Sequence, residues 1–180
     1  HAYDILKFNQ TAEGMLGEGD RANAAIFEKK GYWPGNTAFQ VEAVYQDNAI
    51  AEMAAKLGKK DDYLFFKNRS HNWVNVFDTV NKFIFPVDAN GKFIHKDPLK
   101  GQGFNESNAW QTTFGLSHDI PLLAKKMGGN DSLCTRLNFA FERGREVDFL
   151  SSYGNGYVSY ANQPGLSNAH VFSYAGKPWL

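Results

Sequence analysis

Residues 39–58 read FQVEAVYQDNAIAEMAAKLG, and this stretch decides the fold class. Its apolar residues recur every three or four positions, which is the period of an α-helix with one buried face. The residues in this series are Val41, Val44, Tyr45, Met53 and Leu57, with Asn48 among them. Gly58 follows directly and predicts the end of the helix, because glycine readily adopts the left-handed conformation that closes helices.

Residues 62–77, DYLFFKNRSHNWVNVF, predict a second helix capped by Asp61 or Asp62. The side chains expected on or near one broad apolar face are Phe65, Phe66, Trp73 and Phe77. Only the segment GKKDD, residues 58–62, connects the two helices. Helices joined by so short a connection pack antiparallel, so the pair predicts an αα-hairpin.

The rest of the chain predicts further helices separated by long loops. Helices are expected over residues 3–15, 21–30, 106–129 (interrupted near Pro121), 131–144 and 167–176. Asp20 and Gly31 should bound the second of these, with Ile26 and Phe27 inward, and Asp131 or Ser132 should cap the fourth. Residues 83–94 predict a small β-hairpin or an extended excursion, since Asn90-Gly91 separates two short apolar runs.

The amino-acid composition narrows the classes of function that this protein could have. Of the 180 residues, 43% are hydrophobic and 15% aromatic, enough for a real core and for stacking surfaces in one domain or part of a larger one. Lys+Arg and Asp+Glu balance at 19 each without a basic run, which argues against nucleic acid as a partner. No apolar run is long enough to cross a bilayer, so a membrane role is not expected.

Two further sequence features bear on the cellular context. Cys134 is the only cysteine, so the chain has no internal disulfide. Glycosylation sequons begin at Asn9, Asn68, Asn105 and Asn130. Four in a chain of this length favour a secreted eukaryotic glycoprotein.

Successive helical pairs without a clear 34-residue repeat suit either an α-solenoid or an α/α toroid. The long, aromatic-rich loops favour the toroid, because binding residues concentrate on loops carried by a rigid scaffold.

Several stretches, in order, resemble glycoside hydrolase family 92, the calcium-dependent exo-acting α-mannosidases. Residues 42–78, EAVYQDNAIA…FD, resemble the family's helical pair with its acidic YDD-type segment. Residues 106–129, ESNAWQTTFGLSHDIPLLAKKMGG, resemble EGNAWQY…PHD…GL…MGG. Residues 160–179, YANQPGLSNAHVFSYAGKPW, resemble YAHGNEPSHH…YNYAGQPW. The similarity covers nearly the whole chain.

The resemblance implies an all-α fold, part of an (α/α)6 toroid of antiparallel helical pairs. Residues 1–180 would be a partial catalytic domain, completed by other segments of the same polypeptide: an N-terminal β-sandwich and the C-terminal part of the toroid. The segment carrying the catalytic base would lie outside this chain. The implied activity is an inverting, calcium-dependent exo-α-mannosidase, α-1,2-type, acting on α-mannoside glycans. The implied location is extracellular if the protein comes from a eukaryote such as a fungus, and periplasmic if it comes from a bacterium.

Glu106 is the leading catalytic candidate. An inverting glycosidase needs a protonated carboxyl beside the leaving oxygen and a second carboxylate, about 6.5–9.5 Å away, to activate water. A poorly solvated aromatic pocket helps an acid keep its proton, and Glu106 stands between Phe104 and Trp110. On a helix Trp110, four residues on, would share its face. By resemblance Glu106 is the general acid; the alternative is an exposed glutamate favoured by the helix dipole.

The predicted substrate-binding residues are Trp110, Asn108, Asp47, Trp33 and Asn162. Trp110 could stack on a sugar ring or belong to the core. Asn108, like Gln111, could hold sugar hydroxyls or orient the acid, or could be a capping or surface amide. Asp47 could contact the ligand or support the N-terminal end of its helix. Trp33 could edge a sugar subsite or pin its own loop, and Asn162 could hold sugar or form a turn fixed by the proline that follows.

Gln163 departs from the family pattern. The family's Asn-Glu-Pro is Asn162-Gln163-Pro164 here, and its His-His pair aligns with Leu166 and Ser167. An amide oxygen can still bind Ca²⁺, so Gln163 is the predicted metal ligand, but it supplies no charge. The departure implies either another sugar or linkage, or weakened catalysis.

Two other functions remain open at this point. A non-catalytic sugar-binding relative would keep the pocket but not the full catalytic set. A peptide-binding helical scaffold would need regular repeats with a continuous concave face, which the irregular loops do not suggest. Zinc, P-loop and serine-nucleophile motifs are absent from the sequence.

Overall fold

The computed structural model describes residues 2–18, 20–150 and 154–180. They form two compact units: unit 1 comprises residues up to 76 together with 86–94, and unit 2 comprises residues 77–85 together with 95–180. Both units are built mainly of helices. In the described part of the chain, no helix is both long enough and apolar enough to span a membrane.

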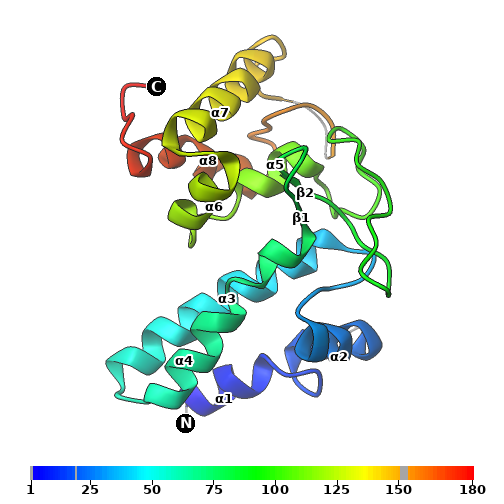
Figure 1. The fold of residues 1–180 in the computed structure, drawn as a ribbon, viewed down its shortest axis with the longest axis vertical. Helices are drawn as coiled ribbons and strands as arrows, with labels where there is room; N and C mark the ends of the chain where they lie inside the picture. The colour runs from blue at the N-terminus through cyan, green and yellow to red at the C-terminus, as the bar shows by residue number, and fades with distance from the viewer. Residues whose placement is uncertain (1, 19, 151–153) are drawn as a thin grey trace. The chain divides into compact units, whose positions relative to one another are not determined.

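The predicted αα-hairpin is the main feature of unit 1. Helices α3 (Thr37–Lys56) and α4 (Lys60–Arg69) lie side by side (Figure 1). Gly58 takes the left-handed conformation, with φ 69°, in the turn between them, which confirms the predicted helix end. The N-cap of α4 is Lys59 rather than an aspartate. Asp61 and Asp62 instead lie in the first turn, where the helix dipole stabilises negative charge.

The second helix of the hairpin is shorter than predicted. α4 ends at Arg69, and a 3-10 helix, η2 (Asn72–Val76), follows it. Phe66 and Trp73 are buried as expected, whereas Phe65 is 56% exposed. Phe65 and Phe66 are adjacent on α4 and point about 100° apart, so one can be exposed while the other is buried.

The buried face of α3 is more polar than its apolar periodicity suggested. Tyr45 and Leu57 are each 52% exposed, while Gln40 and Asp47 are fully buried. The apolar part of the face packs on α1 (Ala2–Asn9) and α4. This cluster consists of Tyr3, Ile50, Ala51, Ala54 and Phe66.

Of the remaining α-helices described in unit 1, one starts and stops at the expected residues and the other ends earlier than predicted. In α2 (Arg21–Lys30), the Asp20 side chain accepts a bond of 3.0 Å from the backbone N–H of Asn23, and Gly31 closes the helix with φ 75°. Phe27 is fully buried. The segment predicted as one helix over 3–15 is α1 followed by a turn and a short 3-10 helix, η1 (Met15–Gly17).

The β structure differs from the prediction. Asn90 and Gly91 form a turn, but the flanking segments share only an isolated antiparallel bridge between Val87 and Phe93. The two-stranded sheet lies in unit 2, where β1 (Phe77–Asp78) pairs antiparallel with β2 (Phe83–Ile84). Strands of two residues carry no periodicity that a sequence reader could detect.

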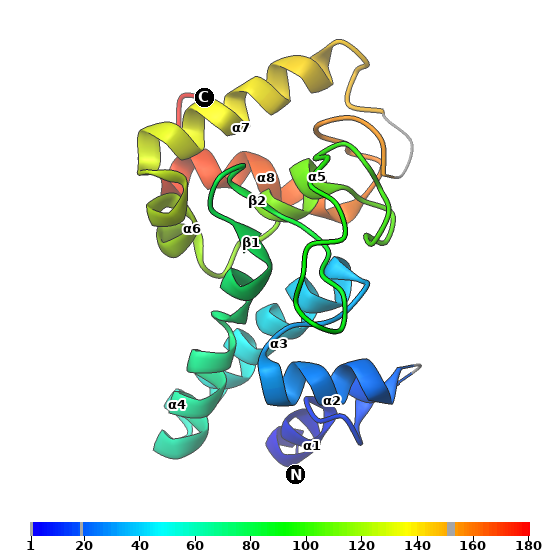
Figure 2. The same ribbon diagram turned by 45° about the vertical axis from the view of Figure 1, so that its right-hand side comes forward.

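In the described part of unit 2 the helices are α5 (Ala109–Phe114), α6 (Ile120–Met127), α7 (Asn130–Arg145) and α8 (Gln163–Tyr174) (Figure 2). Here α5 packs on α8, and α6 packs on α7. Residues 115–119 separate α5 from α6, so the interruption precedes Pro121, which lies in the first turn of α6 where proline is tolerated. Gly129, rather than Asp131 or Ser132, is the N-cap of α7.

Candidate active site

Glu106 lies in the loop that enters α5, not on the helix. The helix begins at Ala109, and Asn108 is its N-cap, whose side-chain oxygen accepts the backbone N–H of Gln111 at 3.2 Å. The expectation that Glu106 shares a helical face with Trp110 is therefore wrong. The Glu106 side chain is exposed, and its backbone adopts a left-handed conformation with φ 51°.

Three amide side chains tie the Glu106 segment to the loop before α8, and we call Asn108, Gln111 and Asn162 the amide clamp. The Asn108 Nδ2 donates to the carbonyls of Gly154 at 3.0 Å and Gly156 at 2.8 Å. The Gln111 Nε2 donates to the carbonyl of Asn155 at 2.6 Å. The Asn162 Nδ2 donates to the carbonyl of Glu106 itself, at 3.0 Å.

The two segments also approach each other closely at the backbone. A Cβ atom on Gly154 would lie 3.2 Å from the carbonyl oxygen of Ser107, and Gly154 has φ 77°. Glycine is thus required there for both conformation and space. Since Asn108 and Gln111 are buried, their bonds to this loop are shielded from water.

Trp110 lies in an aromatic cluster and also borders a hollow. It is 8% exposed, with ring centroids of Phe83 at 4.6 Å, Tyr157 at 5.2 Å and Phe139 at 5.7 Å. A hollow of about 550 Å³ is lined by Trp110, Asp131, Ser132, Thr135, Arg136 and Phe139. Trp110 therefore serves the core and presents an edge to a surface hollow.

Arg136 is one of the residues of this hollow that sequence reasoning missed. Its guanidinium lies 4.5 Å from the ring centroid of Phe83 and 5.8 Å from that of Trp110. It also donates to the carbonyl of Asn81 at 2.9 Å. Burial lowers the pKa of Arg136. Arg136 and Phe139 stand three residues apart on α7, a spacing typical of neighbours on a helical face, but nothing in the sequence linked that face to Trp110.

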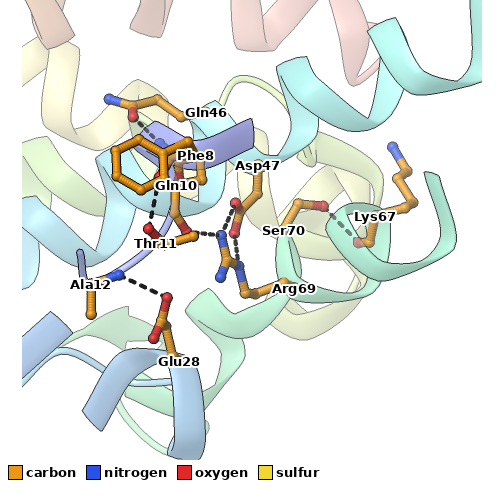
Figure 3. Close-up of polar contacts among 10 residues, drawn as sticks. All are labelled: Phe8, Gln10, Thr11, Ala12, Glu28, Gln46, Asp47, Lys67, Arg69 and Ser70. Atoms are coloured by element: carbon orange, nitrogen blue, oxygen red, sulfur yellow. Dashed lines mark hydrogen bonds and ion pairs between the residues drawn. The ribbon is translucent and has the colours of Figure 1, made fainter. Parts of the chain in front are cut away.

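Asp47 forms a buried ion pair in the middle of α3 (Figure 3). The Arg69 Nε donates to one carboxylate oxygen at 2.7 Å, and a terminal guanidinium nitrogen donates to the other at 2.6 Å. That terminal nitrogen also donates to the Gln10 carbonyl at 2.9 Å. Burial raises the pKa of Asp47, and the bonds from Arg69 act in the opposite direction.

This ion pair joins the ends of α1 and α4 to α3. The Arg69 guanidinium also lies 5.2–5.4 Å from the ring centroids of Phe27, Phe65 and Phe66. The prediction that Asp47 supports the N-terminal end of its helix is wrong, because the residue lies in the middle of α3. A sugar contact by Asp47 stays a prediction, with both carboxylate oxygens bonded to Arg69 in the structure.

Trp33 is 2% exposed and packs on Phe39 and Phe27, with ring centroids at 5.1 and 6.4 Å. Its backbone N–H donates to the buried side-chain oxygen of Gln40 at 2.6 Å, so it pins its own loop. A sugar contact by Trp33 also stays a prediction.

The predicted site residues divide between the two units. Trp33 and Asp47 belong to unit 1. Unit 2 brings together the Glu106 segment, Asn108, Trp110 and Asn162 through α5 and the amide clamp. Asn162 is thus bonded to the Glu106 backbone, and Asn108 is bonded to the loop that precedes Asn162, in a way that only the fold could reveal.

The predicted calcium ligand cannot be placed, since the side chain of Gln163 lies outside the described ones. Within the described residues, no three His, Cys, Asp or Glu side chains gather as a metal site. Neighbouring Asn162 offers its amide nitrogen to the Glu106 carbonyl. The described donor set does not by itself form a calcium site.

Comparison with solved structures identifies the fold. The structure resembles solved enzymes of the glycosidase class. One is the inverting mannosidase BT2199 of Bacteroides thetaiotaomicron, with a TM-score of 0.82 and 23% identity over 99% of this chain and 27% of that one. Another is the α-mannosidase BT3965 of the same organism, with a TM-score of 0.73 and 23% identity over 99% of this chain and 26% of that one. These likenesses show the fold, part of a helical toroid.

The particular family follows from the sequence match. Residues 1–180 match the Glycosyl hydrolase family 92 catalytic domain, so the chain belongs to glycoside hydrolase family 92. A relative from the fungus Arthroderma benhamiae, described as an uncharacterized secreted glycosidase, is 26% identical over 164 residues, covering 74% of this chain and 21% of the relative. The chain thus spans about a quarter of the length of these proteins.

Proposed function

We propose that the protein is an inverting exo-α-mannosidase of α-1,2-type in which Glu106 is the general acid. The observation that carries the proposal is an exposed carboxylate on a backbone that Asn162 holds at a loop junction. Family membership and two mannosidases among the structural neighbours support the substrate class. A structural neighbour in complex with mannoimidazole supports a mannose-shaped site.

The reaction follows from the chemistry of a glycosidic bond. Glu106 gives its proton to the glycosidic oxygen as the bond from that oxygen to C1 breaks, and the leaving alcohol departs. Water attacks C1 from the opposite face and passes its proton to a second carboxylate, which another segment of the polypeptide supplies. The charge that develops on the ring is oxocarbenium-like, so contacts to the ring hydroxyls strengthen in the transition state.

The remaining predicted site residues would support the reaction in different ways. Trp110 and Phe139 offer aromatic surface at the hollow, beside the hydroxyls of Ser132 and Thr135. Asn108 would act through the loop that it holds, because its amide nitrogen donates to two carbonyls. A sugar contact by Asp47 or by Trp33, which both belong to unit 1, is a separate proposal, and Asn162 would act on Glu106.

We propose Ca²⁺ as the cofactor, as in the family, with Gln163 as this chain's ligand through its amide oxygen. When bound, the ion would help to distort and hold the mannose ring. We propose a secreted location on the basis of the fungal relative's description, and glycans carrying α-linked mannose as the partner.

The decisive experiment measures hydrolysis of α-linked mannobioses by the full-length protein and by its Glu106→Gln variant, each with and without a chelator. We expect turnover to fall by about 10²- to 10⁴-fold in the variant, the usual contribution of a general acid. Glu142→Gln, a change to an exposed glutamate of α7, is the matched control and should leave turnover unchanged. Full activity in Glu106→Gln would refute the role of Glu106.

One observation favours a second function. Gln163 replaces the family's glutamate, so a sugar-binding protein without turnover is the alternative. Binding of mannose by the wild-type protein, measured calorimetrically, without hydrolysis of any linkage would establish it.

A further inference from the structure

We infer that Asn162 is a positioning residue that holds the general acid Glu106 through its backbone. The inference rests on the proposed role of Glu106. It assigns to Asn162 an action through another residue, in place of a direct contact with the sugar.

The backbone conformation of Glu106 requires contacts that keep it in place. Its φ of 51° lies in the left-handed region, where a residue with a Cβ is strained and which glycine, asparagine and aspartate adopt more readily. Such strained conformations persist only when the surroundings enforce them. They also concentrate at active sites, where a side chain must point in a direction that relaxed backbone does not give.

The surroundings of Glu106 enforce this conformation from two sides. On the C-terminal side, Asn108 is fixed by its bonds to the carbonyls of Gly154 and Gly156. At the residue itself, Asn162 donates to the Glu106 carbonyl. Rotation of the peptide after Glu106 toward relaxed values would turn that carbonyl away from Asn162 and break the bond.

Asn162 comes from a segment that the rest of the amide clamp already holds. Gln111 and Asn108 bind the carbonyls of residues 154–156, and α8 begins directly after Asn162 and packs on α5. The donor atom is therefore well placed relative to α5. Loss of this one bond should loosen the Glu106 side chain while leaving the helices and their contacts in place.

Positioning of an acid and binding of a sugar give different kinetics. While its nitrogen is bonded to the Glu106 carbonyl, Asn162 cannot donate that hydrogen to a sugar hydroxyl. Loss of a positioning contact lowers kcat where proton donation limits the rate, with little change in KM, whereas loss of ground-state binding raises KM. An aryl mannoside with a good leaving group needs no proton, so it bypasses the defect of a misplaced acid.

The test uses the full-length protein and compares Asn162→Ala with wild type on an α-mannobiose and on 2,4-dinitrophenyl α-mannoside. We expect kcat for the disaccharide to fall by about 10- to 100-fold, part of the usual general-acid contribution, with KM little changed. We expect no more than about a threefold change on the activated substrate. Asn90→Ala, at an exposed turn of unit 1, controls for a general asparagine-to-alanine effect.

A double variant closes the test. Because Asn162 acts through Glu106, adding Asn162→Ala to Glu106→Gln should cause no further loss on the disaccharide, a strongly non-additive result. Equal losses on both substrates, or additive losses, would overturn the positioning role while leaving Glu106 as the acid. Unchanged activity of Glu106→Gln alone would overturn the proposed function itself, which keeps the two failures distinct.

Discussion

The two units use a carboxylate in opposite ways. In unit 1, Asp47 is fully buried and its oxygens are bonded to the Arg69 guanidinium. In unit 2, Glu106 keeps its carboxylate exposed while the amide clamp holds its backbone. A buried charge must be paired because the interior solvates it poorly, whereas an acid that donates a proton must be reachable. The contrast separates a carboxylate that holds the fold from one available for chemistry.

The largest expected effect on stability is at Asp47. Asp47→Ala leaves the Arg69 guanidinium buried without its carboxylate, which typically costs about 3–5 kcal/mol of unfolding free energy. Denaturant unfolding of the full-length protein measures it. Glu52→Ala is the matched control on the same helix, since its ion pair with Lys67 is exposed on the surface, and it should cost no more than about 1 kcal/mol. Equal losses of unfolding free energy in the two variants would show that the buried ion pair of Asp47 stabilises the fold no more than the exposed pair of Glu52.

A smaller effect is expected at Asp78, a second buried carboxylate. Although burial raises its pKa, bonds from Lys96 and from the backbone N–H groups of Asn81 and Val80 bring the pKa of Asp78 down to about 2. The folded pKa lies below the unfolded one, so its stabilisation is present above pH 4 and lost toward pH 2. The loss amounts to about 2 kcal/mol.

The Asp78 prediction is checked by comparing acid unfolding of the wild-type protein with that of Asp78→Asn. The variant should show a shallower fall in stability between about pH 4 and pH 2. Parallel curves would show that these three contacts to Asp78 contribute nothing to the stability.

A helix cap should matter less again. Asp20→Ala removes the acceptor for the backbone N–H of Asn23 at the start of α2, which should cost about 1 kcal/mol. A lower denaturant midpoint, with no change in the slope of unfolding free energy against denaturant concentration, would confirm this loss of stability. Asp20→Asn preserves an acceptor and should lose much less.

The smallest stability effect belongs to Glu106. Because its side chain is exposed, Glu106→Gln should change the unfolding free energy by less than about 0.5 kcal/mol. A loss of activity without a loss of stability, set against Asp47→Ala, would give the comparison its sharpest form. A large destabilisation would instead place Glu106 with the structural carboxylates.

The αα-hairpin could be predicted because its signals are local. Apolar periodicity, Gly58 and a short connection all act within a few residues. The polar members of the buried face could not be predicted, since Asp47 is stable there only because Arg69, in another helix, reaches it. Likewise the short sheet and the 3-10 helix after α4 depend on tertiary contacts that outweigh local preferences.

The site was predictable as a set of residues but not as an arrangement. Family resemblance pointed to Glu106, Asn108 and Asn162, yet their hydrogen bonds connect positions about fifty residues apart in sequence. The left-handed backbone of Glu106 carries no sequence signal, because glutamate does not favour it. Arg136 and Phe139 were missed because their contact with Trp110 is made between helices.

The connection between α3 and α4 has a kinetic consequence. Asp47 and Arg69 are 22 residues apart, so closing the hairpin costs little loop entropy and is expected to be fast. Gln10, whose carbonyl shares the same guanidinium, is 59 residues away in sequence but is already synthesised when Arg69 emerges. We therefore expect the hairpin to form early on the ribosome, with its ion pair as a nucleus onto which α1 docks before unit 2 exists.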